Sequence, residues 1–266
     1  MTSNHSKVII LAAGEGKRLH PLTLDKPKCM VEIFGKRVLE WQLEIFKQFN
    51  INDITIVTGY MAEKINLQSL TYFNNPDYSS NNMVETLFCA RDKLKGSVIV
   101  VYGDIIFEKD VLKKLLESKD DCSVVVDKNW EDLWKIRFDN PLDDAESLMV
   151  DKKNYLTSIG QKTIQQKEIQ GQYIGLMKFQ NDGLELIKNK YDEAKTISKN
   201  GKNILNPNLD FEKSYMTDFL QYLIRNNVKL KAINIKNGWL ELDSISDYKI
   251  YQSLMESGDI TKLFRV

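Results

Sequence analysis

Short apolar runs alternate with amphipathic stretches through the first half of the chain. The runs are apolar at consecutive positions, as is typical of strands buried on both faces, and the stretches between them carry apolar residues at helical spacing. The expected strands cover residues 7–13, 53–58, 70–73, 97–102 and 122–126, and the expected helices cover about 38–50, 82–93 and 110–118. Buried strands separated by helices indicate an α/β fold with a doubly wound, mostly parallel sheet.

The pattern changes after residue 127. The expected elements are strands at 145–150 and 155–159, a polar surface excursion at 189–210, a helix at 215–226 and a last helix from about Ile245. The runs 230–235 and 239–242 flank a short polar turn, which predicts a hairpin. We therefore expect a single domain over 1–266, with an α/β core at 1–127 and a smaller α+β lobe at 128–266.

The charges balance, since Lys and Arg number 37 and so do Asp and Glu. A neutral chain has no general attraction for nucleic acid or an acidic membrane, so an anion site must be local. Three cysteines without a CxxC spacing argue against a disulfide scaffold and a structural zinc site, and they fit the cytoplasm. The longest apolar runs are too short to cross a bilayer, so no membrane span is expected.

A glycine-rich, basic loop follows the first expected strand. Gly14 and Gly16 allow backbone N–H groups to approach an anion, and Lys17, Arg18 and Lys28 add positive charge. The loop fits neither GxxxxGK[ST] nor GxGxxG, because arginine stands where the first motif needs Ser or Thr and leucine where the second needs its last glycine. These residues favour a polyphosphate ligand.

The segment from Leu11 to Lys28 matches LxxGxGxRLxPLTxxxPK at every defined position, and it resembles the nucleotidyltransferase family. The resemblance implies a Rossmann-like core at 1–127 that binds a nucleoside triphosphate, with Arg18 and Lys28 as catalytic residues at the phosphates. It also implies nucleotide contacts from a set of loop residues: Leu11, Ala12, Ala13, Gly14, Glu15, Gly16 and Lys17. Asn82 is a candidate amide that reads the base, or alternatively a helix cap.

Two aspartates are candidate ligands for Mg²⁺, which would let two polyanions approach each other. Asp104 follows an apolar strand at the edge where α/β sheets bind ligands, and the family places its first metal aspartate after a similar strand. Asp243 in Trp239-Leu240-Glu241-Leu242-Asp243 fits the family's second metal aspartate. Glu241 would face the same side of that strand.

Other segments are similar to the phosphocholine-cytidylyltransferase-like branch of the family. They are the stretch after Asn81 and the blocks 126–130, 134–137, 144–146, 171–176 and 239–243. The resemblance implies transfer of CMP from CTP to a small phosphate or phosphonate, such as phosphocholine, 2-aminoethylphosphonate or phosphoglutamine, with release of pyrophosphate. The lobe at 128–266 would then bind the acceptor, with Arg137, Glu146, Lys162 and Glu241 as candidate contacts.

Two other functions fit the same loop. One is a sugar-1-phosphate nucleotidyltransferase that uses UTP, GTP or dTTP, and the other is a non-catalytic nucleotide-binding relative. The presence of Arg18, Lys28, Asp104 and Asp243 together argues against the non-catalytic relative. An exposed hairpin or helix could pair two subunits as a homodimer, although no pattern identifies such a surface.

Overall fold

The computed structural model describes residues 6–163 and 165–266. Its centre is a seven-stranded sheet in the order β12-β8-β11-β6-β1-β4-β5. The strands of this sheet are β1 (Ser6–Ala12), β4 (Ile54–Thr58), β5 (Thr71–Asn74), β6 (Ser97–Tyr102), β8 (Cys122–Asp127), β11 (Gln172–Gln180) and β12 (Lys231–Ile235). Only β11 runs antiparallel to its neighbours, so the expected mostly parallel α/β sheet is confirmed.

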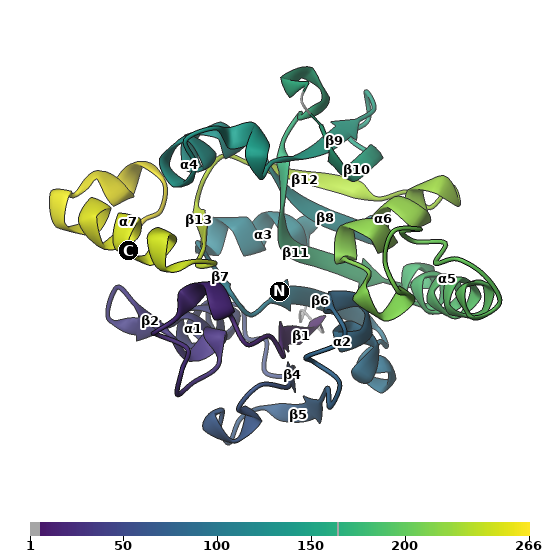
Figure 1. Ribbon diagram of the computed structural model, residues 1–266, viewed down its shortest axis with the longest axis horizontal. Coiled ribbons are helices and arrows are strands. Elements are labelled where there is room, and N and C mark those ends of the chain that lie inside the picture. Colours follow the sequence, from purple (N-terminus) through teal and green to yellow (C-terminus); the bar gives the residue numbers. More distant parts are fainter. Residues whose placement is uncertain (1–5, 164) are drawn as a thin grey trace.

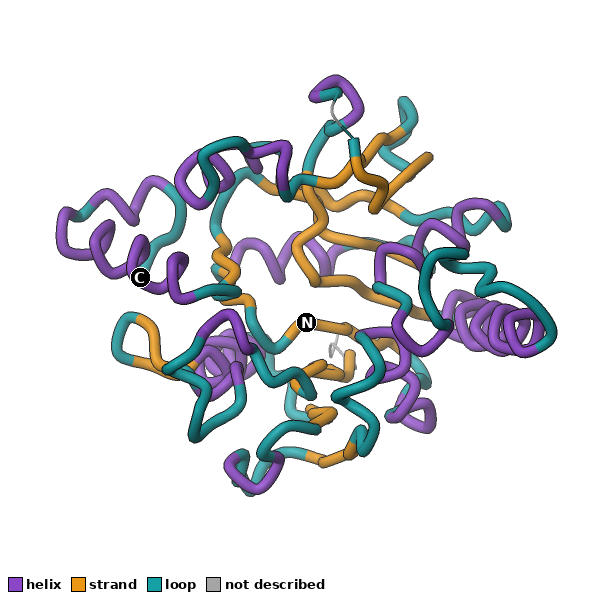
Figure 2. Tube along the Cα trace, in the orientation of Figure 1, coloured by secondary structure: helices purple, strands orange, loops and turns teal. Residues whose placement is uncertain are grey.

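Helices cover both faces of the sheet because its strands carry apolar side chains on both faces. In β1, Val8 and Ile10 pack in one buried cluster, whereas Ile9 and Leu11 pack in the other. The first cluster includes side chains of α1 (Val38–Gln48), α3 (Lys109–Glu117), α4 (Trp130–Arg137) and α7 (Ile245–Ser257). The second includes side chains of α2 (Met83–Cys89), α5 (Asp182–Lys199) and α6 (Met216–Arg225). Figure 2 shows the strands running between these helices.

Three two-stranded sheets complete the described fold. They are β2 (Glu32–Ile33) with β3 (Lys36–Arg37), β7 (Ile105–Phe107) with β13 (Trp239–Glu241), and β9 (Glu146–Val150) with β10 (Leu156–Lys162). The antiparallel β9 and β10 confirm the expected strand pair around a polar turn. The β7 and β13 pair matters for the site, because it brings residue 241 beside the segment that follows Asp104.

Two expectations for the second half were wrong. Strands β12 and β13 do not form a hairpin: β12 pairs with β8 in the central sheet, and β13 pairs with β7. The turn between them instead leads the chain from the central sheet to the two-stranded sheet of β7 and β13. The backbone N–H of Asn237, in this turn, donates to Asp127. The expected surface excursion at 189–210 is helical over its first half, where the apolar face of α5 packs on the sheet.

The central sheet takes strands from both sides of residue 127. Figure 1 shows β11 and β12 beside β8, although these strands come from the part of the chain beyond residue 128. The division into 1–127 and 128–266 stays a prediction about which substrate each part binds, and the two parts share one sheet. Among the described residues no helix combines the length and apolar character needed to cross a bilayer.

Candidate active site

The glycine loop leaves β1 at the carboxyl edge of the sheet. Gly16 has a φ of +70°, a left-handed conformation that glycine adopts without strain. A Cβ at this position would lie 3.1 Å from the Cβ of Lys28, so the missing side chain lets the loop pack against Lys28. The hydroxyl of Thr23 donates to the Gly16 carbonyl over 2.9 Å and holds the loop in place.

A cavity of about 290 Å³ lies between this loop and the ends of β1 and β6. Most of the residues expected at the nucleotide phosphates and metal line it together. The lining residues are Leu11, Ala12, Gly14, Gly16, Lys17, Arg18, Lys28, Cys29, Met83, Gly103, Asp104 and Asp243. Ala13 and Glu15, which were expected among the nucleotide contacts, do not line the cavity, and Glu15 pairs with Lys17 at 3.4 Å.

Lys28 joins the two expected metal aspartates. Its Nζ lies 2.8 Å from Asp104 Oδ2 and 2.7 Å from Asp243 Oδ1. Burial alone would lower the pKa of Lys28, but the charges of Asp104, Asp243 and Glu241 outweigh it, so the pKa is raised above its usual range. Lys28 is therefore a fixed cation at the centre of the site.

Arg18 approaches Asp243 from the solvent side. Its Nη2 lies 3.0 Å from Oδ1 and 2.8 Å from Oδ2 of Asp243, and the arginine side chain is largely exposed. Burial favours the neutral acid at Asp243, but Lys28 and then Arg18 outweigh it and lower the pKa of that carboxyl. Asp243 therefore carries its negative charge at neutral pH.

Three carboxylates converge at this point. Asp104, Glu241 and Asp243 each have an oxygen within 4.8 Å of the others. Asp104 Oδ1 is buried and has no hydrogen-bond partner among the described residues, which is uncommon for a buried polar atom. Hard oxygen ligands and one unsatisfied buried oxygen fit a divalent cation such as Mg²⁺.

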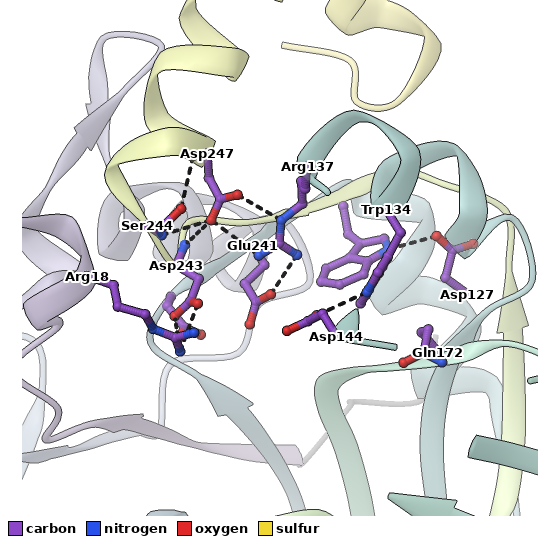
Figure 3. A network of polar contacts seen from close by, with 12 residues as sticks. Arg18, Asp127, Trp134, Arg137, Asp144, Gln172, Glu241, Asp243, Ser244 and Asp247 are labelled. Atoms are coloured by element: carbon purple, nitrogen blue, oxygen red, sulfur yellow. Dashed lines mark hydrogen bonds and ion pairs between the residues drawn. The ribbon is translucent and has the colours of Figure 1, made fainter. Parts of the chain in front are cut away.

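Arg137 lies beside Glu241 and Asp247, as Figure 3 shows. Its Nη1 donates to Glu241 over 2.8 Å, and its Nε donates to Asp247 over 2.9 Å. The arginine side chain is only 2% exposed. The expected direct contact with an acceptor does not fit this geometry, because the guanidinium is buried against two carboxylates of its own chain.

Asp247 was missed in the sequence analysis. It accepts the backbone N–H groups of Asp243 and Ser244 at the start of α7. The signal that could have found it is the spacing Ser244-x-x-Asp247, a capping box at a helix start. The pairing of Asp247 with Arg137 has no signal in the sequence, because 110 positions separate the two residues.

Glu146 and Lys162 lie opposite each other in the β9 and β10 pair. Burial, followed by repulsion from Asp218 and Asp144, raises the pKa of Glu146 to about 7. The backbone of Glu146 is fixed by the Gln172 side chain, which donates to its carbonyl over 2.6 Å. The lobe thus presents a titratable acid beside an exposed lysine.

Asn82 begins α2. Its side-chain oxygen accepts the N–H of Met83 over 2.8 Å, as in a helix cap, and Met83 is the residue that reaches the cavity. The amide nitrogen of Asn82 faces the Lys213 carbonyl at 3.5 Å. A contact between Asn82 and a nucleotide base stays a prediction.

A doubly wound sheet with a glycine-rich basic loop and a carboxylate cluster at its carboxyl edge is typical of proteins that bind nucleotides together with a metal ion. The model of the MobA-like NTP transferase domain matches residues 8–157, more than half of the chain. The chain belongs to this family, and it is a nucleotidyltransferase.

Curated relatives agree over different lengths. The chain is 40% identical over 253 residues to the CTP:phosphoglutamine cytidylyltransferase of Campylobacter jejuni, which covers 91% of this chain and 97% of the relative. It is 32% identical over 127 residues to the choline-phosphate cytidylyltransferase of Streptococcus pneumoniae, which covers 44% of this chain and 56% of the relative.

A solved structure supports the same fold. The CTP:phosphocholine cytidylyltransferase from Streptococcus pneumoniae superposes with a TM-score of 0.73 at 20% identity. The superposition covers 94% of this chain and 99% of that one. The Rossmann-like nucleotidyltransferase fold that the loop motif implied is thereby confirmed.

Proposed function

We propose that this protein is a cytidylyltransferase that transfers CMP from CTP to a small phosphorylated acceptor of the phosphoglutamine type, with release of pyrophosphate. The observation that carries the proposal is the 40% identity to a CTP:phosphoglutamine cytidylyltransferase along nearly the whole of both chains. The cavity that joins the glycine loop to Lys28, Asp104 and Asp243 supplies the matching chemistry. The three cysteines are free, which fits a reducing cytoplasm.

In this reaction a phosphate oxygen of the acceptor attacks the α-phosphorus of CTP. A new P–O bond forms, the bond between the α-phosphorus and its bridging oxygen breaks, and pyrophosphate leaves with that electron pair. The acceptor phosphate is already an anion at neutral pH, so no general base is needed. Catalysis then depends on positioning and on neutralising charge.

The basic residues of the loop supply that neutralisation. Arg18 and Lys28 would contact the phosphates of CTP, with Lys28 at the α-phosphate, and the backbone from Leu11 to Lys17 would surround the nucleotide. Asp104 and Asp243, assisted by Glu241, would hold Mg²⁺, which screens the repulsion between the two phosphate groups when bound. Residues 1–127 thus supply most of the nucleotide site, and Glu241 and Asp243 join it from beyond that boundary.

The pair of Glu146 and Lys162 suits an acceptor that carries both an ammonium and a carboxylate. An amino-acid acceptor presents these two groups, and the two side chains offer opposite charges at neighbouring positions. Glu146→Gln should raise the KM for phosphoglutamine and leave the KM for CTP unchanged. In the wild type the KM for the acceptor should rise as the pH falls through about 7, because Glu146 gains a proton there. A parallel rise in the KM for CTP would contradict this role.

The proposed function is tested by pyrophosphate release in the presence of Mg²⁺. CTP, UTP, GTP, dTTP and ATP are each combined with phosphoglutamine, phosphocholine, 2-aminoethylphosphonate and several sugar 1-phosphates. We expect the highest kcat/KM with CTP and phosphoglutamine. Preferred turnover of UTP, GTP or dTTP with a sugar 1-phosphate would instead support the alternative nucleotidyltransferase, and no turnover with any pair would contradict the proposal.

A further inference from the structure

A chain of hydrogen bonds connects Asp243 and Glu241, two of the three clustered carboxylates. Asp247 Oδ2 accepts the backbone N–H of Asp243 over 3.1 Å and that of Ser244 over 2.8 Å. Arg137 Nε donates to Asp247 Oδ1 over 2.9 Å, and Arg137 Nη1 donates to Glu241 Oε2 over 2.8 Å. The chain therefore starts at the backbone of Asp243 and ends at the carboxylate of Glu241, as the dashed lines in Figure 3 show.

Arg137 and Asp247, the two residues in the middle of this chain, are buried. The Arg137 side chain is 2% exposed and the Asp247 side chain 3%, so water competes little for their hydrogen bonds. Arg137 also lies over the rings of Trp134 and Phe138, at 5.5 and 5.2 Å from their centroids, which fixes the plane of its guanidinium. Because the planar guanidinium donates to both Asp247 and Glu241, it restricts the orientation of each carboxylate.

Helix capping accounts for only part of this chain of hydrogen bonds. The capping box of α7 needs the contacts between Ser244 and Asp247, in which Asp247 N donates to Ser244 Oγ over 3.2 Å. It does not need Arg137, which comes from α4 and is 110 positions away. A buried ion pair is by itself weak evidence of stabilisation, so its position against the acidic cluster calls for another explanation.

We propose that Asp247 and Arg137 are positioning residues that hold Glu241 and Asp243 in the geometry in which these carboxylates bind the divalent cation. The inference rests on the proposed metal site. Neither residue touches the cation or a substrate, and both act through the ligands. Partners behind the ligands of a metal site commonly set its affinity, and their loss costs about 10- to 100-fold.

The test measures binding without turnover. The dissociation constant of CTP is determined by calorimetry with and without Mn²⁺, and the ratio of the two values reports the contribution of the metal site. In Asp247→Asn the amide can still accept the N–H groups of Asp243 and Ser244, but its NH₂ group meets Arg137 Nε, donor against donor. We expect the gain in CTP affinity from Mn²⁺ to fall about 10-fold or more, while the metal-free affinity stays unchanged.

Arg137→Lys provides the second variant. It keeps the charge and removes the two-pronged geometry, so it should show a smaller loss of the same kind. Ser244→Ala is the matched control, because it removes the cap hydroxyl and leaves the contact between Arg137 and Asp247. It should lower the melting temperature without changing the gain from Mn²⁺. Asp192→Asn, which weakens an exposed Arg–Asp pair that does not line the cavity, should change neither.

The outcomes separate this inference from the proposal beneath it. A wild-type protein whose CTP affinity does not respond to Mn²⁺ would contradict the metal site itself. If the wild type responds and folded Asp247→Asn and Arg137→Lys respond equally, the positioning role is wrong and the proposed function stands. If Ser244→Ala loses the same gain as Asp247→Asn, capping alone explains the effect, and the role of Arg137 is likewise overturned.

Discussion

Two aspartates follow buried strands at the same edge of the central sheet, and their surroundings differ. Asp127 ends β8 and is fully buried, and its two oxygens accept from Trp239 Nε1, Asn129 N and Asn237 N at 2.9–3.0 Å. Asp104 follows β6 and is 8% exposed. One of its oxygens accepts from Lys28, and the other has no partner among the described residues.

The difference separates a structural carboxylate from a functional one. A folded chain normally satisfies its buried polar atoms, and at Asp127 three donors do so. These donors tie the end of β8 to the turn between β12 and β13, so Asp127 supports the strand that carries Glu241. At Asp104 the chain leaves one oxygen without a partner among the described residues, and Asp104 belongs to the acidic cluster. An unsatisfied buried oxygen therefore indicates where a ligand binds.

The largest expected effect is on the turnover of Asp104→Asn. The substitution removes a negative charge from the metal cluster, so kcat/KM should fall by about 10²-fold or more. The free energy of unfolding should change little, because the amide NH₂ can replace Oδ1, which had no partner, while the remaining oxygen still accepts from Lys28. Pyrophosphate release and urea unfolding measure the two quantities.

Asp110→Asn is the control for Asp104, since it removes an exposed aspartate at the start of α3. It should leave both turnover and stability unchanged. Near-normal turnover of Asp104→Asn at every Mg²⁺ concentration would remove Asp104 from the metal site and end the contrast with Asp127.

The opposite result is expected for Asp127→Asn. One oxygen becomes an NH₂ group that must face either the Trp239 N–H or the two backbone N–H groups, so at least one buried donor loses its acceptor. The variant should lose about 1–3 kcal/mol in its free energy of unfolding. Its kcat/KM, measured at a temperature where it is folded, should stay within about threefold of the wild type. A loss of turnover as large as that of Asp104→Asn would show that Asp127 is not merely structural.

Local patterns in the sequence predicted much of the site. The strand and helix rhythm located Asp104 at a strand end, and the glycine loop located Arg18 and Lys28, because these features depend on residues close together in the chain. The insertion of β11 between β6 and β8 has no such local signal. The same holds for the contact between Arg137 and Asp247, and for the partners of Asp127. For this reason β12 and β13, expected as a hairpin, lie in two different sheets, and Arg137, expected to contact the acceptor, forms a buried ion pair.

Two lysines whose side chains are largely buried show a similar contrast with the opposite charge. Lys28 faces three carboxylates, and its pKa is raised because they outweigh its burial. Lys178 in β11 is 2% exposed, and no carboxylate of the described residues is in hydrogen-bond contact with it. Its Nζ donates to the carbonyl of Ser118 over 2.6 Å, at the end of α3. Burial, reinforced by Lys119, lowers the pKa of Lys178 to about 8.

Lys178 has the smallest predicted effect on turnover, and it contributes a pH dependence of stability. Between about pH 8 and 10.5 the unfolded chain holds a proton on Lys178 that the folded chain releases, so stability should rise with pH across this interval. Below pH 8 both states are protonated, and the full cost of burying the charge is present, at most about 3 kcal/mol. Lys178→Met removes this dependence. The difference in free energy of unfolding between wild type and variant should therefore shift in favour of the wild type from pH 7 to pH 10, while kcat/KM at pH 7 stays the same. Parallel stability curves over this range would show that Lys178 is already solvated in the folded chain, and the contrast with Lys28 would then rest on the carboxylates alone.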